Sequence, residues 1–253
     1  MARIPIALQM YTVREEAELD FIDTLDRVAE LGYVGVELAG TGGLKAVEFK
    51  AIVDDLGLRI AGAHVSLALL ETELDESLDY YSQLGVKHIT CPWLPENRRQ
   101  TGDQYRTLAQ SLNLIGAAAS GRGIQLCYHN HAFEFERFEG EMAFDILFDE
   151  TSPSLVKIEL DTYWAEFAGV SAIGIMEKYA GRIPMLHLKD MTNDDERTFA
   201  EVGEGTMDFE SILAASGTAG VEWLIVEQDK CKRPALESAE ISLRNLQKLV
   251  VGS

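Results

Sequence analysis

Polar side chains that can bind a metal ion or carry a proton stand at the ends of short apolar runs along this sequence. Four of the 5 histidines are at such positions, together with carboxylates, an amine and aromatic rings. The residues at the run ends are Gln9, Tyr11, Glu37, His64, Trp93, His129, His131, Asp161, His187, Lys189 and Glu227. Carboxylates buried near one another repel unless a positive charge lies between them. A divalent cation with imidazole and carboxylate ligands is the simplest arrangement, and such mixed ligands suit Mn²⁺, Co²⁺, Zn²⁺ or Fe²⁺.

Each of these residues also has an ordinary structural interpretation. A single histidine at a strand end is more often a hydrogen-bonded structural residue than a ligand. Asp161 is typical of a turn or a helix cap, and Glu37 or Glu227 can form an internal ion pair with a lysine or arginine. The functional interpretation is favoured because the same kind of position is polar in one run after another.

The apolar runs belong to a repeating unit, in which an amphipathic stretch ends in glycine and an apolar run follows. Glycine commonly ends a helix, because it adopts the left-handed conformation without strain. Apolar runs of about four to eight residues are typical of strands buried on both faces of a parallel sheet. The predicted strands are residues 4–11, 33–37, 58–64, 86–93, 124–129, 156–161, 183–187 and 221–227.

Helical periodicity fills the gaps between these strands. The predicted helices are 21–31, 44–56, 74–84, 105–119, 142–148, 173–179, 209–213 and 236–249, with Asp103 and Asp208 as N-caps. Eight strands alternating with eight helices predict a closed (β/α)8 TIM barrel, an α/β fold, as a single domain over residues 1–253. An open doubly wound sheet is the alternative. It is disfavoured because no GxGxxG follows the first strand and no GxxxxGK[ST] occurs.

Composition and charge limit the possible binding partners and the cellular location of the protein. The chain has 22 Lys and Arg against 42 Asp and Glu, and its formal charge of −20 disfavours nucleic acid. The 3 cysteines form no CxxC pair, and neither a signal-peptide pattern nor an apolar stretch of roughly 20 residues is present. These features predict a cytoplasmic protein that has no membrane partner. The apolar segment 67–70 is compatible with an interface in a homo-oligomer or with a buried loop.

The strand ends resemble those of the xylose isomerase-like barrel superfamily, the sugar phosphate isomerase/epimerase group that includes inosose dehydratases and ketose 3-epimerases. The likeness covers essentially the whole chain. It rests on segments 8–14 (LQMYTVR), 35–38 (GVEL), 128–135 (YHNHAFEF), 159–164 (ELDTYW), 186–190 (LHLKD), 203–209 (GEGTMDF) and 226–227 (VE). The resemblance implies a TIM barrel, a divalent metal ion and a small-molecule carbohydrate or cyclitol substrate.

Position by position, the resemblance implies that Asp161, His187 and Glu227 are metal ligands. The fourth ligand of the family is usually a glutamate at the end of the fifth strand. This sequence has His129 there, which can bind a metal through one ring nitrogen. Ketose epimerases of the superfamily use two glutamates on opposite faces of the substrate, and this sequence retains only Glu227 of the pair.

The chemistry that follows is proton abstraction next to a carbonyl group. The metal ion, with Mn, Co or Zn the leading candidates, polarises a substrate oxygen and stabilises an enediolate. Glu227 is the first candidate base, and Lys189, His131 or His129 returns the proton or protonates a leaving hydroxyl. The candidate substrate-binding residues are Gln9, Glu37, His64, Trp93 and Trp164, with the tryptophan rings able to stack on a sugar.

The predicted function is therefore a metal-dependent isomerase or epimerase of a carbohydrate or cyclitol. A dehydratase or lyase acting on a keto-sugar or inosose is the alternative, because one of the two glutamates is replaced. Two further alternatives are a catalytically silent sugar-binding barrel and a phosphodiesterase for abasic DNA. Retention of Asp161, His187 and Glu227 opposes the first, and the charge of −20 opposes the second. Because few cationic residues stand near the predicted mouth, an unphosphorylated substrate is favoured.

Overall fold

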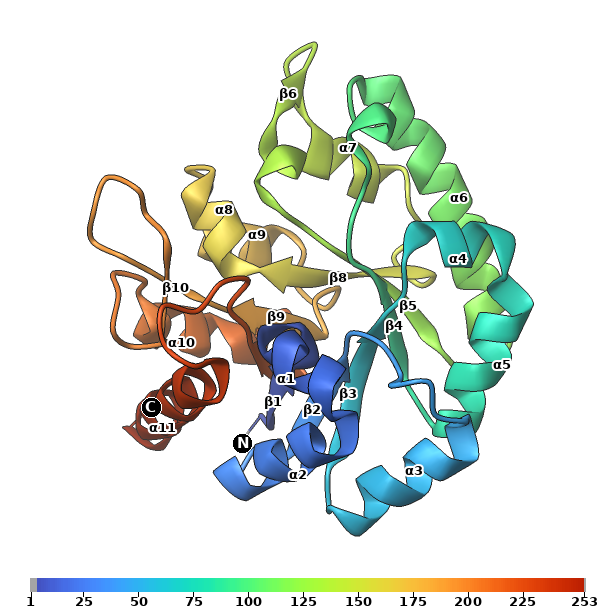
Figure 1. The fold of residues 1–253 in the computed structure, drawn as a ribbon. Helices are drawn as coiled ribbons and strands as arrows, with labels where there is room; N and C mark the ends of the chain where they lie inside the picture. Colours follow the sequence, from blue (N-terminus) through green and yellow to red (C-terminus); the bar gives the residue numbers. More distant parts are fainter. Residues whose placement is uncertain (1–3, 253) are drawn as a thin grey trace.

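Eight parallel strands close into a barrel in the computed structural model, which describes residues 4–252 (Figure 1). The barrel strands are β1 (Ile6–Gln9), β2 (Gly35–Leu38), β3 (Arg59–His64), β4 (His88–Cys91), β5 (Gln125–His129), β8 (Val156–Asp161), β9 (Met185–Leu188) and β12 (Trp223–Val226). Their order around the barrel is β1-β12-β9-β8-β5-β4-β3-β2, so β12 closes the sheet against β1. The predicted (β/α)8 barrel is confirmed. The predicted domain boundary, 1–253, includes residues 1–3 and 253, which lie outside the described residues.

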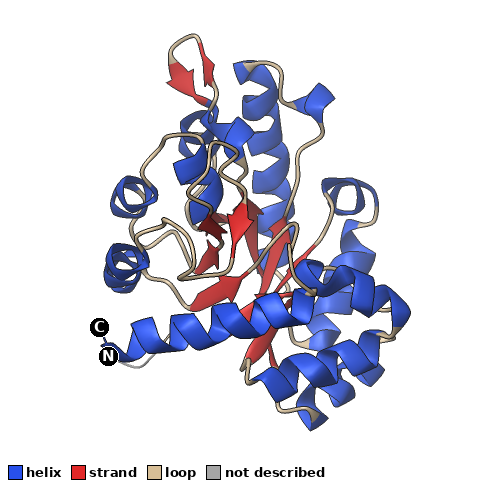
Figure 2. Ribbon diagram, turned by 60° about the vertical axis from the view of Figure 1, so that its left-hand side comes forward, coloured by secondary structure: helices blue, strands red, loops and turns tan. Residues whose placement is uncertain are grey.

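Helices surround the barrel on its outer face (Figure 2). They are α1 (Arg14–Leu19), α2 (Phe21–Leu31), α3 (Ala46–Asp55), α4 (Leu67–Thr72), α5 (Leu74–Leu84), α6 (Gly102–Ser120), α7 (Ala143–Asp149), α8 (Thr162–Phe167), α9 (Ala172–Lys178), α10 (Phe209–Ala219) and α11 (Ala235–Gly252). The sequence pattern misses α1, α4 and α8, which have 6 residues each, because fewer than two turns show no clear periodicity. Across residues 4–252, the helices fall short of the length and apolar character that crossing a membrane requires.

Several element ends differ from the prediction. The apolar run 4–11 forms β1 and then a 3₁₀ turn at Met10–Val13, so it is a strand over only half its length. Asp103 was wrongly predicted as an N-cap. The cap of α6 is Thr101, whose hydroxyl accepts the Gln104 amide at 3.3 Å, while Asp103 lies in the first turn. Asp208 is confirmed as the cap of α10, where its carboxylate accepts the Ser211 amide at 3.1 Å.

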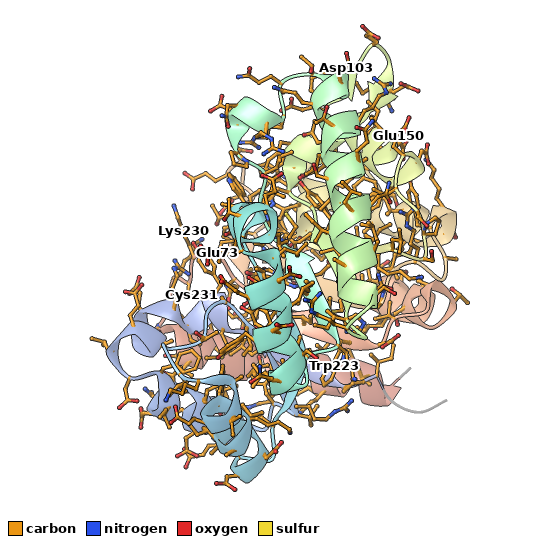
Figure 3. The ribbon with its side chains drawn as sticks, turned by 90° about the vertical axis from the view of Figure 1, so that its right-hand side faces the viewer. Glu73, Asp103, Glu150, Trp223, Lys230 and Cys231 are labelled. Carbon is orange, nitrogen blue, oxygen red and sulfur yellow. The ribbon has the colours of Figure 1, made fainter. Side chains whose placement is uncertain are left out.

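The barrel interior is filled in layers, with an apolar layer towards the amino ends of the strands and a polar layer at their carboxyl ends. Small and apolar side chains pack inside the lower part of the barrel: Ala7, Ala61, Cys127, Met185, Trp223 and Ile225. Trp223 is at the amino end of β12, and Lys230 and Cys231 lie in the loop beyond this strand (Figure 3). The Arg59 guanidinium stacks on the Trp223 ring at 4.6 Å. The polar residues at the opposite, carboxyl ends of the strands are therefore supported by a closely packed apolar layer.

The segment 67–70 is part of α4. Leu67 and Leu70 are buried in the core, and Leu69 is 41% exposed. Two of its three leucines therefore pack inward, as expected for a buried segment.

The loop after β9 is organised by one buried carboxylate, that of Asp190. It accepts the backbone amides of Met191, Gly203, Gly205 and Met207 at 2.8 to 3.0 Å. A Cβ atom at residue 205 would collide with this carboxylate, so glycine is required there. Residues 193–196, at the tip of the loop, are exposed. The base of the loop is fixed while its tip faces solvent.

Candidate active site

The predicted polar residues meet at the carboxyl ends of the strands, the face that holds the active site in TIM barrels. A cavity of ≈ 500 Å³ opens there. It is lined by Tyr11, Ala39, Gly40, His64, Ser66, Pro92, Trp93, His129, His131, Glu227 and Asp229. Asp161, His187 and Lys189 are buried at the same end of the barrel, in contact with this lining.

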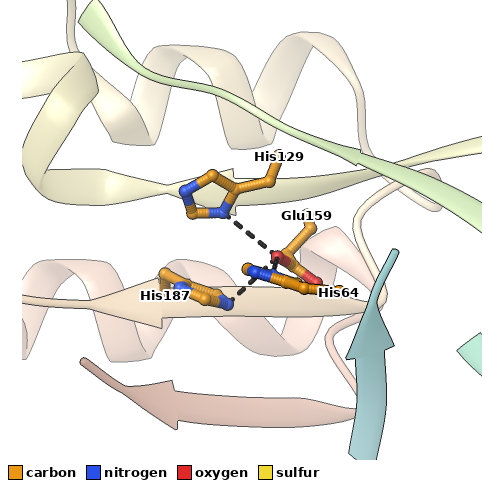
Figure 4. A group of neighbouring side chains, drawn as sticks. All are labelled: His64, His129, Glu159 and His187. Carbon is orange, nitrogen blue, oxygen red and sulfur yellow. Dashed lines mark hydrogen bonds and ion pairs between the residues drawn. The ribbon is translucent and has the colours of Figure 1, made fainter. Parts of the chain in front are cut away.

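Three imidazoles converge on one buried carboxylate, that of Glu159 (Figure 4). Its Oε1 lies 2.7 Å from His64 Nε2, 3.1 Å from His129 Nδ1 and 3.1 Å from His187 Nε2. Its Oε2 accepts the Thr90 hydroxyl at 2.7 Å. These imidazoles come from β3, β5 and β9, and Glu159 comes from β8. We call His64, His129, His187 and Glu159 the histidine cluster.

Glu37 is a second carboxylate that contacts the histidine cluster. Its Oε2 accepts Gln9 Nε2 at 2.8 Å and lies 2.7 Å from His187 Nε2 and 3.4 Å from His64 Nε2. Its Oε1 is buried and has no hydrogen-bond partner within residues 4–252. Burial and the nearby charge of Glu159 raise the pKa of Glu37 to about 7. Gln9 and Glu37, both predicted to bind substrate, are completely buried and bind each other.

A second group of charges surrounds the ammonium of Lys189. Its Nζ lies 2.9 Å from Asp161 Oδ2, 2.8 Å from Glu227 Oε2 and 2.7 Å from Asp229 Oδ2. The other oxygen of Asp161 accepts the Trp164 amide at 2.9 Å, so the helix-cap interpretation holds for that oxygen. We call Lys189, Asp161, Glu227 and Asp229 the lysine cluster.

Two imidazoles connect these clusters. His187 Nδ1 lies 2.8 Å from Glu227 Oε2, and His129 Nε2 lies 3.6 Å from Asp161 Oδ2. Each ring therefore has one nitrogen towards Glu159 and the other towards the lysine cluster. This arrangement gives two sets of possible metal ligands. Within each set, all the ligand atoms lie within 4.8 Å of one another. The sets are His64, His129, Glu159 and His187, and His129, Asp161, His187 and Glu227, of which the second is the set implied by the resemblance.

The clusters stabilise their own charges. Burial lowers the pKa of His187, but Glu159, Glu37 and Glu227 outweigh it and hold that pKa well above its usual value. The pKa of Lys189 is likewise held well above its usual value by the carboxylates around it, despite burial. Burial would raise the pKa of Glu159 and of Glu227, yet their cationic neighbours hold both well below the usual value.

His131 stands in the cavity wall, and one of its ring nitrogens has no hydrogen-bond partner among the described residues. Its Nδ1 is buried and has no hydrogen-bond partner in the described part of the chain. Its backbone amide donates to Glu134 at 2.7 Å, and its ring meets the edge of Trp93 at 4.7 Å between centroids. Burial, together with the nearby charges of His129 and Lys189, holds the pKa of His131 well below its usual value. The ring is therefore neutral near pH 7 and able to accept a proton.

The two predicted tryptophans lie at different depths. Trp93 lines the cavity and is 48% exposed. Trp164 packs against His131 at 5.7 Å between ring centroids. Its Nε1 is buried without a hydrogen-bond partner among residues 4–252. Trp93 can stack on a bound ring, whereas Trp164 supports the side chain of His131 in the cavity wall.

Sequence reasoning missed Glu159 and Asp229. Glu159 precedes Asp161 by two residues on β8, and side chains two apart in a strand point to the same side. The alternation that placed Asp161 inside the barrel therefore also places Glu159 there, one layer deeper. Asp229 follows β12 in a loop, where no periodic signal indicates its direction.

The fold and this mouth define a class, that of TIM barrels with a buried cluster of histidines and carboxylates at the carboxyl ends of the strands. A divalent ion fits this donor set, because two imidazoles and two carboxylates within 4.8 Å are ligands that Mn²⁺, Co²⁺ and Zn²⁺ accept. The chain belongs to the xylose isomerase-like TIM barrel family, whose sequence pattern matches residues 25–249.

Relatives and solved structures agree with this assignment. An inosose dehydratase of Geobacillus thermodenitrificans is 24% identical in an alignment that covers 84% of this chain and 83% of the relative. A crystal structure described as a sugar phosphate isomerase/epimerase from Parabacteroides distasonis has a TM-score of 0.84 and 27% identity, covering 98% of this chain and 94% of that one. The IolI protein, crystallised with a zinc atom, shares the fold with a TM-score of 0.77 and 16% identity, over 98% of each chain. The chain is thus a member of a family of sugar-modifying enzymes.

Proposed function

We propose that this protein is a lyase that removes a proton next to the carbonyl of a keto-sugar or inosose and expels a substituent from the neighbouring carbon. The observation that carries the proposal is the unequal exposure of the glutamates. Glu227 lines the cavity, whereas Glu37 and Glu159 are completely buried against imidazoles. In ketose epimerases, two glutamates on opposite faces of the substrate exchange a proton with it. Here such a mechanism lacks a second glutamate at the cavity. Elimination can proceed with a single proton carrier.

His131 is the proton carrier in this proposal. Its neutral ring presents an unpartnered Nδ1, whereas Glu227 Oε2 already contacts Lys189 and His187. The His131 ring takes the proton from carbon, and the electron pair of the C–H bond becomes the new C=C bond. The C–O bond to the leaving group breaks, and the imidazolium passes its proton to the departing oxygen. The products are an enone and water or an alcohol, and His131 is neutral again.

The ammonium of Lys189 is 1% exposed and fixed by three carboxylates, so its charge is already balanced inside the protein. Stabilisation of the negative charge that develops on the carbonyl oxygen therefore calls for a further cation. A divalent ion held by His129 and His187 with carboxylate ligands would supply a Lewis acid that polarises the carbonyl oxygen.

The substrate class follows from the lining of the cavity. Among its lining residues are Tyr11 and Trp93, which can pack on a ring, and neither lysine nor arginine is among them. The inosose dehydratases among the relatives are named for a neutral keto-cyclitol. We propose an unphosphorylated keto-sugar or inosose.

The test is incubation of the Co²⁺-loaded or Mn²⁺-loaded protein in D₂O with an inosose and a panel of keto-sugars. We expect enone absorbance in the ultraviolet and a stoichiometric leaving group. We expect H131N to reduce kcat by ~10²–10⁴-fold, the contribution of a positioned proton carrier. The matched control is H88N, because His88 is also a buried histidine but lies at the start of β4, outside the cavity lining. Full activity of H131N would disprove the role of His131.

A second candidate function is an isomerase or epimerase acting through the same proton abstraction. It is favoured by the structure from Parabacteroides distasonis, which is described as a sugar phosphate isomerase/epimerase. Deuterium incorporated into the sugar without loss of a substituent would establish this function in place of the lyase.

A further inference from the structure

We infer that a second cavity, beside the one described above, binds a neutral apolar ring that is attached to the sugar through oxygen. The cavity described above is called the main cavity from here on. The inference deepens the proposed function, which allows either water or an alcohol as the leaving group. A substrate that fills both cavities is a keto-sugar or inosose with an O-linked ring, and elimination releases that ring as an alcohol.

The two cavities adjoin at the loop that follows β2. The second cavity has a volume of ≈ 440 Å³, and Ala39 and Gly40 line both it and the main cavity of ≈ 500 Å³. Gly40 has a φ of 125°, and a Cβ atom added there would meet nothing within 4 Å. The shared boundary therefore consists of exposed residues with the smallest side chains, and a ligand in the main cavity can extend past them.

Arg14 fixes the other side of this boundary. Met10 lines the second cavity together with Arg14, and the next residue in the chain, Tyr11, lines the main one. The Arg14 guanidinium lies 4.2 Å from the centroid of the Tyr11 ring, and it donates to the Tyr11 carbonyl at 2.7 Å and to the Asp229 carbonyl at 3.0 Å. Because Tyr11 and Asp229 both line the main cavity, these contacts hold the two cavities in a fixed relation.

The second cavity is larger than the loss of water requires. A water molecule takes about 30 Å³ of the liquid, so an expelled hydroxyl group would need only a small part of this space. Sites for small molecules commonly have volumes of about 300–1,000 Å³, and the second cavity falls within that range. Space of this size next to the reacting carbon fits a substituent that has a ring of its own.

The lining of the second cavity favours an apolar ring. Met10, Ala17 and Phe21 form its apolar part. The Phe21 ring meets the edge of the buried Phe49 ring at 5.3 Å between centroids, and a Cβ atom at Gly42 would lie 2.6 Å from it, so the ring is held on two sides. A fixed aromatic face of this kind can pack on a bound ring without being ordered first.

The charges of the lining favour a neutral group over an ion. Arg14 and Glu18 line the second cavity with opposite charges, so their sum does not select an anion or a cation. Glu18 is exposed, as are Ala39 and Gly40, so the cavity opens to solvent and a released alcohol can leave through it.

The elimination balances with such a leaving group. The electron pair of the broken C–O bond stays on the oxygen of the substituent, and this oxygen takes the proton that was removed from carbon. The products are an enone and an alcohol, and neither water nor a redox partner is consumed.

The first test measures binding without turnover. Methyl β-glucoside and phenyl β-glucoside have no keto group, so neither can eliminate, and they differ only in the group that would enter the second cavity. Calorimetric titration of the whole protein is expected to show ~10–100-fold tighter binding of the phenyl glucoside, the effect of burying one apolar ring. Equal affinities, or no measurable binding of the phenyl glucoside, would overturn the inference.

A matched pair of variants locates the effect. A17F fills the second cavity and is expected to bring the two affinities close together. A215F is the control, because Ala215 is also a partly buried helical alanine packed against the core but lies outside both linings. A preference for the phenyl glucoside that persists in A17F would contradict the second cavity as its site.

Crystals of the unaltered protein with phenyl β-glucoside do not depend on the folding of a variant. A phenyl ring within about 4.5 Å of Phe21 and Met10 supports the inference, and a phenyl ring bound elsewhere overturns it.

The 3-keto derivatives of the same glucosides connect binding to chemistry, because their aglycone oxygen is on the carbon beyond the one that loses its proton. Enone formation from an unsubstituted inosose, together with equal binding of the two glucosides, would keep the proposed function and exclude the second cavity. Tighter binding of the phenyl glucoside without elimination from its 3-keto derivative would keep the binding site and exclude the lyase.

Discussion

The histidine cluster and the lysine cluster share one barrel mouth but balance their buried carboxylates differently. Around Lys189, one ammonium contacts three carboxylates, with all three distances below 3 Å. Around Glu159, three imidazoles contact one carboxylate oxygen, and two of these rings also contact Glu37. The lysine is a permanent cation, whereas an imidazole carries charge only when protonated and otherwise offers a lone pair. The comparison shows that buried negative charge can be balanced either by a permanent cation or by rings whose charge depends on protonation.

The largest effect that tests this comparison is expected from K189M. Removing the ammonium leaves Asp161 and Asp229 without their cation and Glu227 with His187 alone, and breaking a buried ion pair in this way costs about 3–5 kcal/mol of unfolding free energy. The measurement is urea unfolding with and without added Co²⁺. We expect the ion to restore part of the loss, because the three carboxylates of the variant can now bind it. D229N is the control, with a smaller loss because Asp229 is 24% exposed. A loss below ~1 kcal/mol for K189M would show that the ion pair is not an important source of stability.

A smaller effect is expected from pH on metal binding. In the metal-free protein, the carboxylates raise the pKa of His64 and of His187 in spite of burial, so both rings hold their protons to higher pH than a free imidazole does. A metal ion must displace these protons, and its affinity therefore falls as pH decreases, by up to about tenfold per pH unit for each proton displaced. Calorimetric titration with Co²⁺ in two buffers of different ionisation enthalpy counts the protons released. Affinity independent of pH would contradict imidazole ligands, which both candidate sets contain.

A third effect, spread over several pH units, concerns Glu134, a buried carboxyl outside both clusters. Burial raises its pKa from the usual 4.5 to about 8, although Tyr128 and the His131 amide donate to it. The folded protein keeps this proton up to about pH 8, while the unfolded chain loses it near pH 4.5. Stability therefore falls as pH rises through this window, by up to ~1.4 kcal/mol per pH unit. E134Q, which resembles the protonated acid, should flatten this dependence in urea unfolding. An unchanged slope would show that Glu134 is ionised in the folded protein.

The fold was predictable because its signals are local. Gly32, Gly85 and Gly220 each end a helix in the left-handed conformation, immediately before an apolar run. The strand positions follow from these signals, but the strand ends do not, because pairing with neighbouring strands decides where each ladder stops. Residues 10–13 show this effect, since they continue an apolar run but turn away from the sheet.

The site was predictable only in part, because side-chain partners depend on distant segments. The sequence brings His64, His129 and His187 to one mouth, yet nothing local shows that one carboxylate oxygen of Glu159 meets all three. Asp229 was also missed, because its direction depends on a loop that Arg14, 215 positions earlier, holds through a hydrogen bond to the Asp229 carbonyl.

Four backbone amides donate hydrogen bonds to Asp190, and these bonds divide the loop after β9 into a fixed base and an exposed tip. Its base adjoins Lys189 in the chain, so the four hydrogen bonds separate the Lys189 ammonium from the exposed tip. Residues 193, 195 and 196 can then be exchanged with little disturbance of the charges around Lys189, whereas Asp194 accepts the Thr192 hydroxyl at 2.7 Å and the Arg197 amide at 2.9 Å. An engineer who wished to modify this loop would begin with those three positions and leave Asp190 and Asp194 intact.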